Sequence, residues 1–278
     1  MGGGVSTIVI TGASAGIGAA AAIDLTSQGH EVLATGRSPS KLAAVHRLMV
    51  AVAPERDAVP EPMVADLSSL AEVRRLSDAV LERCPTIDVL ANNAGLHTSH
   101  RQVSTDGFEL VFAVNHLAPF LMTNLLAERL GASGGRVITT SSGVQSVAKL
   151  DLDDLNLEKH WSSFRRSYAG SKLANIAFTS ELTRRSGLPA TCFHPGGVRT
   201  DLSRDSRLRF LGSRLGRSPA RGADTLIWLA TTDEGARPAA VYYADRKPAK
   251  ICAAGRDPEL ARRLWDASAQ MVGLAAPV

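Results

Sequence analysis

The stretch Ser167-Tyr168-Ala169-Gly170-Ser171-Lys172 places a phenol and an amine at a spacing that could support acid–base chemistry. The chain holds only three tyrosines, and Tyr168 stands four residues before Lys172. Residues four apart share one face of a helix, so both side chains can point into one cleft. A free phenol has a pKa of about 10, which a nearby ammonium lowers. Taken alone, the pair is either a working acid–base couple or a chance pair on a helix surface.

A glycine-rich segment near the N-terminus is a second candidate for chemistry. Thr11-Gly12-Ala13-Ser14-Ala15-Gly16-Ile17-Gly18 follows an apolar run and opens a helical pattern. Glycines at such a strand-to-helix turn let a pyrophosphate approach the backbone amides and the positive end of the helix dipole. The spacing is GxxxGxG, without the GK[ST] ending of a nucleotide-hydrolysing P-loop. The segment therefore predicts a dinucleotide site, although glycines also serve tight turns for backbone reasons alone.

The residues after the second apolar run select between cofactors. An acidic residue there would bind the ribose 2′-hydroxyl of NAD and repel a 2′-phosphate. The chain instead has Gly36-Arg37-Ser38, with no carboxylate before Glu55. Arg37 can form charge-assisted bonds to a phosphate, and Ser38 can add a donor. We therefore expect NADP(H), with NAD(H) as the alternative.

Composition limits the classes of protein to which the chain can belong. Hydrophobic residues make up 45% and charged residues 21%, the balance of an ordinary globular protein. Three dispersed cysteines (84, 192 and 252) give no zinc or disulfide pattern and fit a reducing, cytoplasmic setting; we expect no metal. The N-terminus does not have the form of a signal peptide. The apolar stretch 108–127 contains Asn115, His116 and Pro119, so we expect a buried helix rather than a membrane span.

The elements that would position these residues alternate along the chain. Helical spacing predicts helices at 16–28, 40–53, 69–83, 105–130, 163–186, 219–232 and 257–272. β-branched runs predict strands at 5–10, 31–36, 61–66, 87–92, 135–141, 189–194 and 239–244. Strands separated by helices predict a doubly wound parallel α/β sheet of about seven strands, with helices on both faces. The alternation continues across 54–62, so we expect one domain over 1–278.

Five motifs in this order resemble the short-chain dehydrogenase/reductase family. They are the glycine segment, Asp66-Leu67, Asn92-Asn93-Ala94-Gly95, Ser141-Ser142, and Tyr168 with Lys172. The stretches "VFAVNHLAPFLMTNLL", "SYAGSKLANIAFTSEL", "FHPGGVRTDL" and "ARRLWDASAQMVGL" are similar to its retinol-dehydrogenase-like branch. The resemblance implies a Rossmann-type fold and an oxidoreductase that acts on lipophilic aldehydes, ketones or alcohols.

The resemblance also implies catalytic roles. Tyr168 would exchange a proton with the substrate oxygen, and Lys172 would lower the pKa of that phenol and hold the nicotinamide ribose. Ser142 would hydrogen-bond the substrate oxygen. Adjacent residues at a strand end point opposite ways, so either Ser141 or Ser142 faces the cleft, and the resemblance favours Ser142. Asn115 would hold a water that links Lys172 to solvent. His97, His116 and His194 are assigned no chemistry.

The cofactor contacts implied by the resemblance extend over most of the chain. Asp66 and Leu67 would flank the adenine, and Asn93, Ala94 and Gly95 would line the adenosine-ribose side. Pro195, Gly196, Val198 and Thr200 would contact the nicotinamide and a phosphate. The full set of expected cofactor residues is Gly12, Ser14, Ala15, Gly16, Ile17, Gly18, Arg37, Ser38, Asp66, Leu67, Asn93, Ala94, Gly95, Tyr168, Lys172, Pro195, Gly196, Val198 and Thr200.

The segment 199–221 carries seven arginines and two aspartates, so its excess of positive charge is larger than the net charge of +4 of the whole chain. By the resemblance, this segment lies where the family has its substrate loop. Its pattern predicts either a solvated amphipathic helix or a lid that attracts an acidic substrate. Nucleic-acid binding is not expected, because no aromatic residues interleave with the arginines. The resemblance implies a possible homo-oligomer paired through the helices at 105–130 and 163–186, although the retinol-dehydrogenase-like branch is less uniformly oligomeric than the family at large. A non-catalytic dinucleotide sensor on the same fold is the alternative function.

Overall fold

The computed structural model describes residues 4–54, 59–198, 216–238, 240–275 and 277. Its eight strands form one sheet in the order β3-β2-β1-β4-β5-β6-β7-β8. They are β1 (Thr7–Ile10), β2 (Glu31–Gly36), β3 (Met63–Val64), β4 (Val89–Asn92), β5 (Arg136–Thr140), β6 (Ala190–His194), β7 (Tyr242–Ala244) and β8 (Lys247–Pro248). All adjacent pairs are parallel except β7 with β8. The expected doubly wound α/β sheet is confirmed, with one short antiparallel strand added at its edge.

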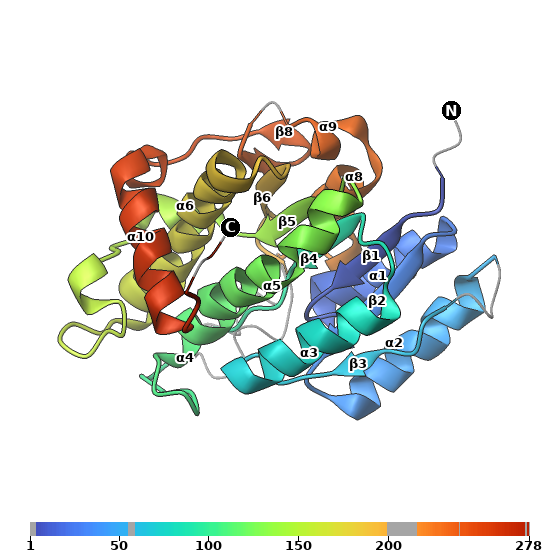
Figure 1. The fold of residues 1–278 in the computed structure, drawn as a ribbon, viewed down its shortest axis with the longest axis horizontal. Helices are drawn as coiled ribbons and strands as arrows, with labels where there is room; N and C mark the ends of the chain where they lie inside the picture. The colour runs from blue at the N-terminus through green and yellow to red at the C-terminus, as the bar shows by residue number, and fades with distance from the viewer. Residues whose placement is uncertain (1–3, 55–58, 199–215, 239, 276, 278) are drawn as a thin grey trace.

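Helices cover both faces of this sheet (Figure 1). On one face lie α1 (Gly16–Ser27), α2 (Pro39–Val52) and α8 (Pro219–Thr231), with α9 (Asp233–Ala236) after α8. On the other lie α3 (Leu70–Arg83), α4 (Leu110–Phe112), α5 (Ala118–Ala132), α6 (Ala169–Ser186) and α10 (Pro258–Met271). In Figure 1, α3, α5 and α6 lie side by side, and α10 packs beside α6.

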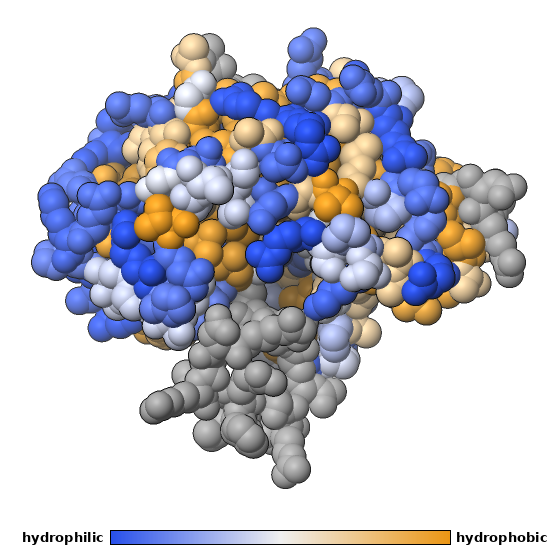
Figure 2. Space-filling model, turned by 90° about the horizontal axis from the view of Figure 1, so that it is seen from below, coloured by the Kyte–Doolittle hydropathy of each residue, from blue (hydrophilic) through white to orange (hydrophobic). Residues whose placement is uncertain are grey.

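The alternation of side chains along each strand divides the core in two. In β1, Ile8 and Ile10 pack towards α1, α2 and α8, whereas Val9 packs towards α3, α5 and α6. Because both faces are buried, the strands are continuous apolar runs rather than alternating ones. The coloured residues in Figure 2 are mostly hydrophilic, and the hydrophobic ones form separate small areas on that face.

The long apolar segment forms a helical run from Leu110 to Ala132, long and apolar enough by composition to cross a membrane. However, 83% of its most apolar window is buried inside the fold, as expected for a core helix. The predicted start at residue 105 is wrong. Glu109 accepts a hydrogen bond from the Phe112 amide at 2.8 Å, and this cap fixes the first helical residue at Leu110.

Two π-helical turns belong to the helices that carry Asn115, Tyr168 and Lys172. Residues Ala113–Leu117 (η2) form one between α4 and α5, and residues Ser163–Tyr168 (η5) form the other directly before α6. Such turns are often found at functional sites, because the extra residue changes the direction of neighbouring side chains. Asn115 lies in η2, in the middle of a continuous helical run, and Tyr168 ends η5, which forms the start of the helix that continues as α6.

Candidate active site

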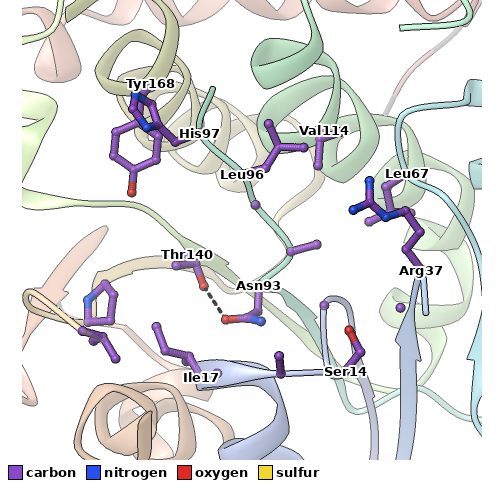
Figure 3. A pocket seen from close by; sticks show the side chains of 18 of the residues that line it. Ser14, Ile17, Arg37, Leu67, Asn93, Leu96, His97, Val114, Thr140 and Tyr168 are labelled. Atoms are coloured by element: carbon purple, nitrogen blue, oxygen red, sulfur yellow. Dashed lines mark hydrogen bonds between the residues drawn. The ribbon is translucent and has the colours of Figure 1, made fainter. Parts of the chain in front are cut away.

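A cavity of about 560 Å³ opens where the strands β1, β2, β4, β5 and β6 end. Ligands of open α/β sheets bind at the carboxyl ends of the strands, at the point where the chain switches from one half of the sheet to the other. In this sheet that point lies between β1 and β4. Figure 3 shows the pocket extending from Arg37 at one end to Tyr168 at the other, with Ser14 and Ile17 along one side. The volume is in the range of sites that hold small molecules or cofactors.

The glycine segment forms one wall of the pocket. Gly12 and Gly16 have φ values of +70° and +58°, which an L-residue with a side chain rarely adopts. Ala15 precedes the first helical residue of α1 without a side-chain cap, and the first turn holds no acidic residue. The first amides of α1 therefore point to the pocket edge without a competing carboxylate, a cradle that fits a pyrophosphate.

Gly18 does not line the pocket, although the sequence places it among the cofactor residues. A Cβ atom there would lie 2.5 Å from Nδ2 of Asn93 and 2.5 Å from the carbonyl oxygen of Gly12. Asn93 in turn donates to the Thr11 carbonyl at 3.0 Å and accepts from the Thr140 hydroxyl at 3.4 Å (Figure 3). Asn93 thus ties together the ends of β1, β4 and β5, and Gly18 makes room for it.

Tyr168 and Lys172 lie on the same side of their shared helix. The Lys172 ammonium sits 5.8 Å from the centroid of the Tyr168 ring, and both residues line the pocket. Lys172 is 2% exposed and donates to the Thr140 carbonyl at 3.0 Å. Figure 3 shows the Tyr168 hydroxyl directed into the cavity. This geometry is that of a cleft-facing couple, not of an exposed helix pair.

Burial determines the proton affinities of both groups. Desolvation raises the pKa of Tyr168 to about 12, while a hydrogen bond with Ser142 acts in the opposite direction. Desolvation also lowers the pKa of Lys172 to about 8. The sequence predicted that Lys172 would lower the pKa of Tyr168, and in the protein without bound cofactor this prediction is wrong. Burial raises the pKa by more than nearby groups lower it. At neutral pH, Tyr168 is a neutral phenol and Lys172 is charged.

The two adjacent serines at the end of β5 have different partners. Ser141 donates its hydroxyl hydrogen to the Lys172 carbonyl at 2.7 Å. Ser142 is hydrogen-bonded to the Tyr168 side chain and also accepts from the Val144 amide at 3.4 Å. Of the two hydroxyl groups, the one on Ser142 is therefore placed with the tyrosine, as the resemblance implies.

Asn115 is fully buried behind the pocket wall and does not line it. Its amide accepts from the Leu96 N–H at 2.8 Å and donates to the Leu96 carbonyl and the Ser171 hydroxyl, each at 3.0 Å. A Cβ atom on Gly95 would lie 3.3 Å from both Asn115 Oδ1 and Lys172 Nζ. Asn115 thus fixes the loop that passes over Lys172.

Apart from Gly18, every expected cofactor residue that the structure describes lines the pocket. Thr200, and residues 199–215 of the arginine-rich segment, lie outside the described residues. Within that segment, Arg217 pairs with Asp245. The pocket is also lined by residues to which the sequence assigned no role, among them Lys41, Leu96, His97, Thr98, Gln102, Leu110 and Val114. Lys41 stands in the first turn of α2, four residues after Arg37, a basic pairing that the sequence does show.

Glu109 is a buried carboxylate that supports the catalytic turn and that the sequence did not indicate. Besides capping α4, it accepts from the Ser167 hydroxyl at 3.0 Å and from the Trp161 indole at 3.4 Å. Ser167 immediately precedes Tyr168. Glu109 therefore joins the start of α4 to the π-helical turn that presents the tyrosine.

Comparison with known proteins identifies the family. A model of the family described as "short chain dehydrogenase" matches residues 6–209. The chain belongs to the short chain dehydrogenase family. A protein of Streptomyces sp. (strain C5), named as a candidate daunorubicin C-13 ketoreductase (DnrU), is 41% identical over 96% of this chain and 92% of its own length. Human retinol dehydrogenase 13 is 34% identical over 98% of this chain and 86% of its own.

Solved structures share the fold of this chain. A protein of unassigned function from Mycobacterium Paratuberculosis has a TM-score of 0.78 and 32% identity, covering 98% of this chain and 95% of its own. A short chain dehydrogenase from Burkholderia cenocepacia J2315, solved in complex with NADP, has a TM-score of 0.68 and 23% identity, covering 91% and 98%. This short chain dehydrogenase is thus a dinucleotide-dependent oxidoreductase of the retinol-dehydrogenase-like branch that acts on CH–OH or carbonyl groups.

Proposed function

We propose that the protein is an NADP(H)-dependent carbonyl reductase for hydrophobic ketones and aldehydes of retinoid-like, aromatic or polycyclic type. The observation that carries the proposal is the convergence of Ser142, Tyr168 and Lys172 at one end of a pocket whose other end holds Arg37. The name of the 41% identical relative, a ketoreductase, supports carbonyl reduction. Retinol dehydrogenase 13 supports a lipophilic substrate.

The residues around Arg37 support NADP(H) over NAD(H). Arg37, Ser38 and Lys41 line the same end of the pocket. The one acidic side chain among the described lining residues is Asp66, and its Oδ1 already accepts from the amide and hydroxyl of Ser68 at 3.0 and 2.8 Å. A pocket lining with cations at Arg37 and Lys41, and with its one described carboxylate already hydrogen-bonded, suits a 2′-phosphate. The NADP complex of the Burkholderia structure is consistent with this choice.

The chain's own residues supply the proton chemistry. When bound, the dinucleotide provides the hydride that reduces the carbonyl carbon. Tyr168, kept neutral by its raised pKa, donates its proton to the carbonyl oxygen. The Ser142 hydroxyl holds that oxygen next to Tyr168, and the Lys172 charge stabilises the phenolate that remains. Asn115 keeps the loop at 95–96 in place over Lys172. We place the reaction in the cytoplasm and in the direction of reduction.

An absorbance screen tests the proposal. NADPH oxidation would be followed at fixed enzyme concentration with aldehydes, quinones and polycyclic ketones, and the screen would be repeated with NADH. We expect turnover of at least one polycyclic or aromatic ketone, with kcat/KM for NADPH at least about 10-fold above that for NADH. No turnover of any carbonyl compound, with NADPH bound, would overturn the proposal.

A further inference from the structure

The turn between β7 and β8 has a backbone conformation that its residues disfavour. Ala244 pairs with Lys247 across the antiparallel pair, so Asp245 and Arg246 form the whole loop. Their φ values are +49° and +60°, and among the described residues only Leu157 also combines a side chain with a positive φ. Two positive φ values in a two-residue hairpin loop are characteristic of a type I′ turn, whose favoured sequence is Asn-Gly. An arginine in particular is uncommon in this region of φ.

The side chain of Asp245 holds Arg217 in a two-point ion pair. Nη1 of Arg217 donates to one carboxylate oxygen, and Nη2 donates to the other at 3.0 Å. The arginine side chain in turn covers Gly196, where a Cβ atom would lie 2.7 Å from Arg217 Cδ and 2.9 Å from Cζ. The Arg217 amide also donates to the Gly197 carbonyl at 2.8 Å. Gly196 lines the cofactor pocket and Arg217 does not, so the arginine supports this wall from behind.

Arg246 makes a second two-point pair, with α8. Its Nε donates to the Asp224 carboxylate at 2.8 Å, and its Nη2 donates to the other oxygen of the same group. Its amide donates to the Thr225 hydroxyl at 3.2 Å. On the same helix, a Cβ atom on Gly222 would lie 2.6 Å from Cγ2 of Val198, which lines the pocket. Arg246 therefore holds α8 against the wall that Arg217 supports.

Local stability does not account for the sequence of this turn. The Asp245 side chain is 52% exposed, and a single exposed ion pair contributes little to the free energy of unfolding. An Asn-Gly sequence would form the same turn with less strain. Strained residues persist where the surrounding structure requires them, commonly beside functional sites. The two charged side chains explain the strain, because each makes one of the two ion pairs behind the pocket wall.

We propose that Asp245 and Arg246 are positioning residues for the reaction, which fix the pocket wall at 195–198. The resemblance places the nicotinamide end of the dinucleotide against this wall. The inference rests on the proposed function and adds two residues to it. Each residue acts through a neighbour, Asp245 through Arg217 and Arg246 through α8. Misplacement of a reacting group by about 1 Å can lower a rate by about 10²-fold, so support of the wall bears on kcat.

The double variant Asp245→Asn/Arg246→Gly tests the inference, because it gives the turn its favoured sequence and removes both ion pairs. We expect a Tm equal to or above that of the wild type. In the protein without cofactor, amide hydrogen exchange of a peptide that covers 193–198 should be at least about 5-fold faster. With NADPH and the best ketone, kcat should be at least about 10-fold lower. A purely local role for the turn predicts the same Tm result with unchanged exchange and unchanged kcat.

Single variants show whether Asp245 acts through Arg217. Asp245→Asn and Arg217→Gln should each lower kcat by about 3- to 10-fold, and the two combined should be no slower than the slower single variant, because both remove one shared interaction. Glu259→Gln is the matched control. Glu259 makes a similar two-point pair with Arg262 on α10, at 3.0 and 2.7 Å, and does not line the cofactor pocket. This variant should keep the wild-type exchange rate and kcat.

The outcomes separate this inference from the proposed function. A wild-type kcat in the folded double variant, with the ketone still reduced, would overturn the positioning role and leave the proposed function intact. A Tm below that of the wild type would show that the ion pairs serve stability, which would also overturn it. Absence of NADPH oxidation by the wild type with every carbonyl compound would overturn the proposed function. The hydrogen exchange of 193–198 would then still show whether the turn fixes the wall.

Discussion

The hydroxyl of Ser141 donates to the backbone carbonyl of Lys172 across 2.7 Å, whereas its neighbour Ser142 bonds to the side chain of Tyr168. The first bond ties the end of β5 to the first turn of α6. The second places a hydroxyl beside the tyrosine in the pocket. Two adjacent serines thus divide structural and chemical tasks, because successive side chains of an extended strand point to opposite sides.

The matched pair Ser141→Ala and Ser142→Ala should separate these tasks. Ser142→Ala should lower kcat by about 10²-fold, the usual cost of losing one donor to a developing oxyanion, with little change in the free energy of unfolding. Ser141→Ala should cost about 1–2 kcal/mol of stability and less than about 5-fold in kcat. Steady-state kinetics and urea denaturation check both variants. A larger kcat loss for Ser141→Ala would reverse the assignment.

The pH dependence of reduction should report Lys172. Burial lowers its pKa to about 8, so its charge is present below that pH and lost as pH rises through it. The pKa of Tyr168 at about 12 keeps the phenol protonated over the whole range. We expect kcat/KM to be level near pH 7 and to fall about 10-fold per pH unit above about pH 8. A profile that stays level to pH 9.5 would show that the lysine charge is not required.

The basic end of the pocket should determine cofactor choice. Arg37→Gln removes a charge-assisted contact to the 2′-phosphate, so the Kd for NADPH should rise about 10- to 100-fold while that for NADH changes less than about 3-fold. Lys41→Gln should act in the same direction. Arg47→Gln, an exposed arginine of α2 outside the pocket, is the control. Fluorescence titration measures all of these, and an equal rise for both cofactors would argue against phosphate recognition.

His116 should make the protein sensitive to acid. It is fully buried between Asn175 and Ser268, and burial lowers its pKa to about 4. Between pH 6.5 and 4 the unfolded chain binds a proton that the folded protein does not, so stability falls as pH decreases, by about 3 kcal/mol. His116→Gln should lose less stability between pH 7 and 4.5 than wild type. His100 is exposed, so His100→Gln should lose as much stability as wild type over the same pH range. If the free energy of unfolding of all three proteins depends on pH in the same way, His116 is not the source of the acid sensitivity.

Much of the fold follows from local pattern. The run Glu31–Gly36 is apolar and β-branched, and the predicted strand coincides with β2. The edge strands were harder to predict because they depend on the sheet. Only Met63–Val64 of the predicted 61–66 strand pairs with β2, and β8 consists of Lys247 and Pro248, residues that disfavour strands. The π-helical turns at Ala113–Leu117 and Ser163–Tyr168 have no signature in composition, since they depend on which carbonyl each amide meets.

The site divides in a similar way. Ser142, Tyr168 and Lys172 stand in motifs with fixed spacing, so their convergence could be predicted from order along the chain. His97, Thr98 and Lys41 reach the pocket only through the path of their loop or helix, which the sequence does not show. Glu109 looks like an ordinary surface acid in the sequence, and only the packing of Ser167 and Trp161 reveals its burial.

The substitution Tyr168→Phe tests the central claim most directly, because it removes one oxygen and leaves the ring packed against His97 and Lys172. NADPH oxidation would be measured with the best ketone from the screen, together with the Kd for NADPH. Loss of a general acid lowers the rate by about 10²–10⁴-fold. We therefore expect kcat to decrease by at least about 10²-fold, while the Kd for NADPH changes less than about 3-fold. A variant that retains more than about a tenth of the wild-type kcat would show that Tyr168 is not the proton donor.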